Sequence, residues 1–450
     1  MGSGPGRELE RKLGLFPVTN VVIANMVGSG IFTTSGLILG ALGDPLLMLA
    51  LWVAGGGVAL CGALTYGALG AEMPEAGGEY VFLSRLYHPL LGFLAGWTSF
   101  LVGFSAPIAA SAIGCSEYFF QAYPRLLDGG NPALLKKALS VGVILLFTGI
   151  HMRGAEFGTR VQNVLTLFKM GLIACMVVGG LLLGSGSVSH FAQGDPLPFS
   201  FGGMKTTGLS LMWILFAYSG WNAATYIGSE IRDPERTLPR SLLLGTGAVV
   251  ALYLLVNVVF VYAVPPAEMK GVIAVGGLAM EKLFGRSMGT AFSLLVAFAL
   301  FSSLSAFLIL GPRVYYSMAK DRLFFGGLAA VNPATGAPGR SIALQGAVSS
   351  LMALTGTFDQ ILTVMGFALG IFPLLAAASV FRLKALRAAG PAPGGKNTLP
   401  GYPWAPAAYL AAGTGVLFLS FFERPVESSL AVGCVLSGVP VYLYFKGKGA

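Results

Sequence analysis

Long apolar runs with few charges alternate with short polar segments along nearly the whole chain of 450 residues. Most runs are long enough, at about 1.5 Å of rise per residue, to cross a hydrocarbon layer about 30 Å thick as a helix. The pattern therefore predicts an all-α polytopic membrane protein with twelve transmembrane helices. Their expected ranges are 17–42, 46–70, 90–120, 138–151, 158–184, 207–229, 241–264, 289–318, 341–357, 360–382, 404–422 and 428–445.

Two of the predicted helices are interrupted near their middle. Gly28 and Gly30 lie in the first helix, and the segment 219–222 (Ser-Gly-Trp-Asn) lies in the sixth. Glycine costs a helix interior about 1 kcal/mol relative to alanine, so both helices are expected to be broken there. A broken membrane helix offers free N–H groups on one half and free carbonyls on the other, which suit the carboxylate and the ammonium of an amino acid. The alternative is that the glycines only admit a neighbouring helix.

The positions of the two breaks predict a five-plus-five inverted repeat. Because equivalent elements are offset by five spans, an odd number, broken helices 1 and 6 should have opposite orientations and meet at the bilayer centre. We expect the first repeat over 17–184, the second over 207–382, and helices 11 and 12 over 404–445. The tails 1–16 and 446–450 complete the chain.

Composition supports this class and the charges predict its orientation. The chain is 55% hydrophobic and 10% charged, with a net charge of +9. The basic residues lie in short loops, mostly on the side that carries both tails, so they indicate cytoplasmic termini in a cell membrane, the inner membrane of a bacterium, and not a nucleic-acid surface. The four cysteines, which lie inside apolar runs, indicate neither disulfides nor a metal site.

Lys169 is the only ionisable residue deep inside a predicted span. An intramembrane lysine is costly and therefore usually functional. It either holds carbonyls at the end of the first half-helix as a static ammonium, or releases a proton during a cycle. Near the breaks, Phe216, Trp221 and Tyr253 are either cavity walls or packing residues. The segment 73–80, with two glycines and three nearby carboxylates, favours a tight turn with solvated charges over a Ca²⁺ site.

Six motifs spread over the chain resemble the amino acid–polyamine–organocation transporter superfamily, and within it the L-type amino acid transporter family. They are GSGIF at 28–32, MPEAGGEYVFL at 73–83, FAYSGWN at 216–222, SEIRDPERTLPRS at 229–241, RVYYSMAKDRLF at 313–324 and ERPVESSLAVGCVLSGVPVYLYF at 423–445. The resemblance implies the five-plus-five inverted repeat followed by two further helices.

The resemblance also implies a site built around the two breaks. The substrate carboxylate would lie on the first break, the α-ammonium on backbone carbonyls of both breaks, and the ring of Phe216 would act as the outer gate. Lys169 would stand where sodium-coupled relatives hold a sodium ion, and Tyr253 with Asn257 would match a Tyr-x-x-x-Asn pattern in helix seven. The candidate substrate-binding residues are Met26, Ser29, Gly30, Ile31, Phe216, Ser219, Trp221 and Asn222, and the candidate coupling and gating residues are Lys169, Tyr253 and Phe216.

These observations predict a sodium-independent exchanger of neutral L-amino acids that works by alternating access. A proton-coupled amino acid symporter is the alternative, and a membrane-embedded enzyme is less favoured, because the spans lack a catalytic constellation. No cofactor and no metal are expected. The predicted outer loop 123–135 lacks the cysteine with which animal L-type light subunits bond a heavy chain, so no disulfide-linked partner is expected. Side-chain preference, direction and oligomeric state stay open.

Overall fold

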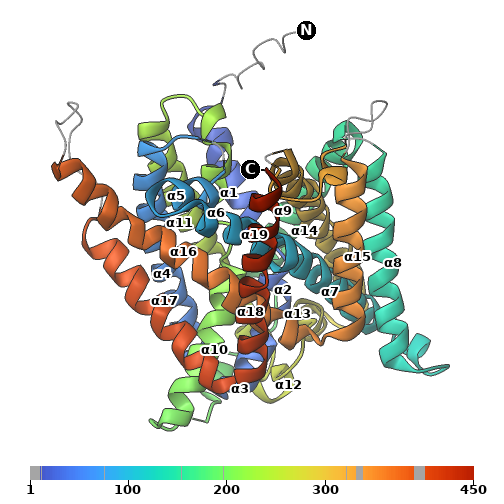
Figure 1. Cartoon of the computed structure of the whole chain (residues 1–450). Coiled ribbons are helices and arrows are strands. Elements are labelled where there is room, and N and C mark those ends of the chain that lie inside the picture. Colours follow the sequence, from blue (N-terminus) through green and yellow to red (C-terminus); the bar gives the residue numbers. More distant parts are fainter. Residues whose placement is uncertain are drawn as a thin grey trace.

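The structure is a computed structural model, and it describes residues 11, 13–75, 77–153, 155–195, 197–320, 322–330, 338–389 and 401–449. The predicted tails 1–16 and 446–450 lie partly outside these residues. The described chain forms a bundle of helices in which the start of α1 and the end of α19 lie at the same end (Figure 1). That end is called the N-terminal end below.

Ten helices of the described residues are long and apolar enough to cross a membrane. The prediction of an all-α polytopic membrane protein is therefore confirmed at this level. The ten are Leu15–Thr33, Pro45–Glu72, Pro89–Ala122, Pro132–Met152, Val164–Leu182, Pro234–Ala263, Arg286–Pro312, Phe358–Leu386, Trp404–Glu423 and Pro425–Gly447. The two remaining predicted spans contain α10 (Phe201–Ala217) and α15 (Gly339–Thr355), which have only 17 residues each. The count of twelve stays a prediction.

The other elements follow in chain order, and their bounds define the labels of Figure 1. They are α4 (Pro45–Glu72), α5 (Glu79–Leu86), α6 (Pro89–Thr98), the π-helix η1 (Ser99–Phe104), α7 (Ser105–Ala122), η2 (Pro124–Leu127), α8 (Pro132–Met152), α9 (Ala155–Leu182), η3 (Val188–Ala192), α11 (Pro234–Ala263), α12 (Pro266–Met269), α13 (Val275–Phe284), α14 (Arg286–Lys320), η5 (Gly326–Ala329), α16 (Phe358–Ala389), α17 (Trp404–Glu423), α18 (Pro425–Leu436) and α19 (Gly438–Gly449).

The first predicted helix is broken where its glycines lie. Helix α1 (Leu15–Met26) ends before Val27, and α2 (Gly30–Thr33) begins three residues later. Thr34 keeps a right-handed helical conformation between α2 and α3 (Ser35–Leu42), so these two form nearly one helical stretch. The break is therefore confined to residues 27–29.

The sixth predicted helix is broken in the same manner. Helix α10 ends at Ala217, and the 3₁₀-helix η4 (Ala223–Glu230) continues the chain after residues 218–222. Gly220 has φ +95°, a left-handed conformation that residues with a side chain rarely adopt. The glycine in this segment is thus required by the backbone turn itself.

The two broken helices run side by side in opposite directions. The first half α1 packs against η4, while α10 packs against α2 and α3. A Cβ atom on Gly30 would lie 2.6 Å from the Cα of Ala217, and one on Gly220 would lie 2.8 Å from the carbonyl oxygen of Asn25. Glycine therefore lets the two backbones touch at both breaks.

Helix α8 is longer than the predicted span 138–151, and that prediction was wrong at its start. The helix begins at Pro132, where the side chain of Asn131 accepts hydrogen bonds from the first turn. Lys136 forms a 2.7 Å ion pair with Glu117 of α7, and the Nζ of Lys137 donates to the carbonyl of Leu354. Both lysines belong to the helix because their long stems carry the charge to such partners.

Helix α11 likewise begins earlier than predicted, at Pro234 instead of residue 241. Its charged first turns were assigned to a loop, but Leu238 in them is fully buried. A Cβ on Gly67 of α4 would lie 2.8 Å from the Cα of Pro239, so this part of α11 packs directly on α4. Tertiary packing of this kind stabilises a helix despite charged residues and an internal proline.

Candidate functional site

The end of α1 is held by two side chains from other helices. The hydroxyl of Tyr253, on α11, donates to the carbonyl of Met26 at 2.7 Å. The ammonium of Lys169, on α9, donates to the carbonyl of Val27. Lys169 is 1% exposed and Tyr253 is fully buried. Carbonyls at a helix end lack partners within the helix, so these two donors satisfy groups that the break leaves open.

Helix α11 contacts both sides of the first break. The amide of Asn257 donates to the carbonyl of Tyr253 at 2.8 Å, and its oxygen accepts a 2.7 Å hydrogen bond from the hydroxyl of Ser35 on α3. Because residues four apart share one face of a helix, Tyr253 contacts α1 while Asn257 contacts α3. One face of α11 thus fixes the two halves of the broken helix relative to each other.

The start of α2 is the other half of the first break. Ser29, Gly30 and Ile31 are all buried there. The hydroxyl of Tyr118 on α7 donates to the carbonyl of Phe32 at 2.6 Å and accepts from the N–H of Gly276 at 3.0 Å. The first N–H groups of a helix have no intrahelical partner, so this buried segment presents donors suited to an anion.

The second break offers carbonyls beside the first. Phe216 is buried near the end of α10, and its carbonyl accepts a 2.8 Å hydrogen bond from the N–H of Ser219. The ring of Tyr218 stacks on Tyr253 with centroids 5.3 Å apart, which connects this break to the donors at the end of α1.

Two candidate side chains of the second break are engaged in other contacts. Trp221 packs edge-to-face on Tyr66 of α4 and on Tyr409 of α17, with ring centroids 4.8 Å and 5.8 Å apart. The amide of Asn222 donates to Glu79 at 2.5 Å. Both side chains therefore anchor the segment after the break, and their contact with a substrate stays a prediction.

The sequence interpretation overlooked residues that reach the breaks from distant helices. Ser303 of α14 is buried, with its hydroxyl 3.9 Å from where a Cβ on Gly28 would lie. Among the described residues this hydroxyl has no hydrogen-bond partner. Trp52 of α4 packs edge-to-face on both Tyr218 and Tyr253. Neither residue has a signal in the sequence, because a serine or a tryptophan in an apolar run is ordinary.

The segment 73–80 is only partly the solvated turn that its sequence suggested. Glu75 forms an exposed ion pair with Arg85. Glu79, in contrast, is 6% exposed and accepts hydrogen bonds from Tyr66, Asn222 and Tyr226. The interpretation was therefore wrong for Glu79, because its partners come from elements that are distant in the sequence or not recognisable in it.

The arrangement offers groups that suit both charges of a small zwitterion. Donors at the start of α2 and carbonyls at the end of α10 lie on backbones in direct contact, as the closeness of Gly30 to Ala217 requires. Within the described part of the chain, no three His, Cys, Asp or Glu side chains gather as a metal site requires. The thiols of Cys61, Cys115, Cys175 and Cys434 are free.

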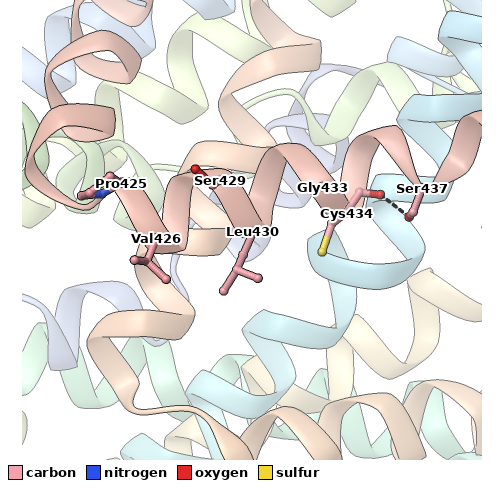
Figure 2. A pocket seen from close by; sticks show the side chains of 7 residues that line it. All are labelled: Pro425, Val426, Ser429, Leu430, Gly433, Cys434 and Ser437. Carbon is pink, nitrogen blue, oxygen red and sulfur yellow. Dashed lines mark hydrogen bonds between the residues drawn. The ribbon is translucent and has the colours of Figure 1, made fainter.

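A surface hollow of about 690 Å³ lies away from the breaks, along α18. Figure 2 shows the side chains of Val426 and Leu430 on this face. The hydroxyl of Ser437 donates to the carbonyl of Cys434, and the donor and acceptor oxygens are 2.7 Å apart. None of its lining residues belongs to either broken helix. The hollow is therefore not part of the candidate site.

Comparison with known proteins gives matches along nearly the full chain. A model of the amino acid permease family matches residues 13–440. The serine/threonine exchanger SteT of Bacillus subtilis is 29% identical over 450 residues, which cover 98% of this chain and 98% of that protein. Asc-type amino acid transporter 1 of Mus musculus is 28% identical, with 96% and 81% covered. Large neutral amino acids transporter small subunit 2 of Homo sapiens is 27% identical, with 98% and 81% covered.

Proposed function

Because this chain belongs to the amino acid permease family, we propose that it is a sodium-independent exchanger of neutral L-amino acids. Amino acid transport across a membrane follows from the family and from the membrane-spanning helices. Exchange and neutral substrates are proposals, supported by relatives whose names are a serine/threonine exchanger and a transporter of large neutral amino acids.

The proposed architecture is twelve spans in a five-plus-five inverted repeat, with both termini cytoplasmic. The contact of α1 with η4 and of α10 with α2 supports it, since paired broken helices of opposite direction are typical of such repeats. Transport would proceed by alternating access, with the two breaks reached first from one side of the membrane and then from the other.

In the proposed complex, the substrate carboxylate accepts hydrogen bonds from N–H groups of Ser29, Gly30 and Ile31. The α-ammonium donates to the carbonyls of Met26, Phe216 and Ser219. These groups lie at the two breaks, where the start of α2 offers N–H groups to a negative charge and the ends of α1 and α10 offer carbonyls to a positive one. The ring of Phe216 would close over the substrate from the α10 side.

The observation that supports sodium independence is the hydrogen bond from the ammonium of Lys169 to the carbonyl of Val27. A sodium ion at this break would need that carbonyl as a ligand. The ammonium of Lys169 already occupies that carbonyl and supplies the positive charge that a sodium ion would bring. A transporter built in this way does not require sodium to complete its site.

Transport in proteoliposomes tests the proposal. Uptake of radiolabelled serine or leucine should rise strongly when unlabelled amino acid is loaded inside, and it should not change when choline replaces sodium. Vesicles without protein and vesicles loaded with a sugar are the controls. Clear sodium stimulation, or full concentrative uptake into empty vesicles, contradicts the exchanger.

A proton-coupled symporter is the second candidate, favoured by the burial of Lys169. A buried lysine that released its proton would couple transport to a proton gradient. Uptake into empty vesicles with an imposed proton gradient separates the two mechanisms. Accumulation driven by the gradient, and lost in Lys169→Ala, would favour the symporter over the exchanger.

A further inference from the structure

A buried carboxylate joins three elements near the second break. Glu79 is the first residue of α5, and its Oε1 accepts hydrogen bonds from the hydroxyl of Tyr66 on α4 at 3.0 Å and from the amide of Asn222 at 2.5 Å. Its Oε2 accepts from the hydroxyl of Tyr226 on η4. These four residues are called the Glu79 cluster below.

The backbone around the Glu79 cluster is packed without room for side chains. Gly78 has φ +53°, and a Cβ on it would lie 2.8 Å from the ring of Tyr226. On the other side, a Cβ on Gly228 of η4 would lie 3.1 Å from the carbonyl of Pro74. The loop before α5 is therefore shaped to receive η4.

The Glu79 cluster lies between the second break and the N-terminal end of the bundle. Asn222 belongs to the break itself, and η4 runs from it to Ile231, which pairs with Leu13 just before α1. The half-helices η4 and α1, which pack against each other, both run from the breaks toward this end. The Glu79 cluster fixes the first of these against α4 and α5.

Because Glu79 carries a carboxylate, the attachment of η4 to α4 and α5 depends on the hydrogen-bond donors around that carboxylate. A buried carboxylate is tolerated only while donors surround it, and hydrogen bonds to a charged acceptor are stronger than neutral ones. The cation on the same helix, Arg85, pairs with Glu75 instead. If η4 moved away, Glu79 would lose two of its three donors and would need water in their place. Tyr226 is 39% exposed, so the edge of the Glu79 cluster lies at the surface of the helix bundle.

We propose that Glu79 is a positioning residue that latches η4 against α4 and α5, and that this latch must open for the breaks to become accessible from the N-terminal end. The inference rests on the proposed transport function, in which the breaks hold the substrate. The latch would hold that end closed, and its opening would replace two of the three protein donors of Glu79, Asn222 and Tyr226, with water.

Thiol accessibility tests the latch directly. A reporter cysteine replaces Ala224, which is fully buried on η4, in a background whose four native cysteines are changed to serine or alanine. The rate of modification by a small water-soluble methanethiosulfonate reagent then measures how often η4 opens. Glu79→Gln and Tyr226→Phe are introduced into this background. Glu75→Gln is the matched control, since it removes an equivalent charge from the same loop at an exposed ion pair.

With Glu79→Gln we expect modification at least about tenfold faster than in the reporter alone, a ratio equivalent to about 1.4 kcal/mol. Tyr226→Phe, which removes one of three donors, should give a smaller increase, and Glu75→Gln should give none. Rates unchanged in both Glu79→Gln and Tyr226→Phe, or raised equally by Glu75→Gln, would refute the latch. If Glu79→Gln yields no folded protein, the modification rates of Tyr226→Phe and Glu75→Gln are compared, and a faster rate in Tyr226→Phe alone supports the latch.

Amino acid exchange measured on the same preparations separates the latch from the proposed function. Faster modification with no exchange by the native protein would keep the latch and remove the exchanger. Normal exchange with unchanged modification would keep the exchanger and remove the latch. In the variants that open more often, exchange should persist with a higher KM for substrate added at the opposite end, because less protein faces that end.

Discussion

Replacing Gly30 by alanine tests the contact between the two broken helices with the smallest possible change. The added methyl carbon would lie 2.6 Å from the Cα of Ala217 and 2.8 Å from its Cβ. Carbon atoms normally approach to about 3.5–4.0 Å, so the two backbones must separate by about 1 Å. Overpacking of this kind costs about 1–3 kcal/mol. A separation of this size also moves the N–H groups of the first break away from the carbonyl of Phe216.

If this strain falls on the substrate-bound state, Gly30→Ala should weaken binding by about tenfold to a hundredfold, since about 1.4 kcal/mol corresponds to a factor of ten. Calorimetric titration of purified protein with serine and leucine gives the dissociation constants. Exchange in proteoliposomes should fall in parallel. The larger Gly30→Leu should abolish binding while the protein still inserts into membranes.

Gly28→Ala is the matched control, in the same break and two residues away. Its Cβ would lie 3.8 Å from the carbonyl oxygen of Met26 and 3.9 Å from Ser303, which are ordinary contacts. We expect its affinity to stay close to that of the native protein. Native affinity in Gly30→Ala, or an equal loss in Gly28→Ala, would show that the close contact with Ala217 does not shape the site.

Three further predictions concern the two donors at the first break and the absence of a disulfide-linked partner chain. Lys169→Ala should slow exchange at every pH between about 6 and 8, because it leaves the carbonyl of Val27 without its donor, and initial rates across that range measure this. Tyr253→Phe should slow exchange less and lower the free energy of unfolding by about 1 kcal/mol, measurable by thermal unfolding in detergent, since it removes one hydrogen bond to Met26. The protein expressed alone should exchange amino acids and migrate identically on gels with and without reductant, because the loop 123–135 has no cysteine.

The family was predictable from the sequence and is confirmed by the match over residues 13–440. The motif 216–222 is recognisable in part because its glycine, Gly220 with φ +95°, meets a local requirement of the backbone, whereas Gly30 in the motif 28–32 meets a tertiary one, the contact with Ala217. Both breaks appear where interrupted apolar runs predicted them. The family resemblance pointed to Tyr253 together with Asn257, and their spacing of four residues places both on one face of α11.

The boundaries of two helices were not readable, because tertiary partners extend them. The first turns of α8 contain Lys136 and Lys137, whose charges find partners on α7 and at the end of α15. The first turns of α11 pack against Gly67 of α4. A rule based on hydropathy starts both helices too late, because it counts the charged residues of the first turns and not the partners of those charges.

The sequence by itself determined that the chain crosses the membrane many times and breaks two of its helices, because apolar runs and glycine act locally. Only the tertiary structure decided what meets at those breaks. Gly30 touches Ala217, 187 positions along the chain by their residue numbers, and Ser303 faces Gly28. Glu79 lies in a motif that suggests a solvated turn, and it is buried because donors from α4 and η4 converge on it. Such contacts depend on how distant helices pack, and no local pattern records them.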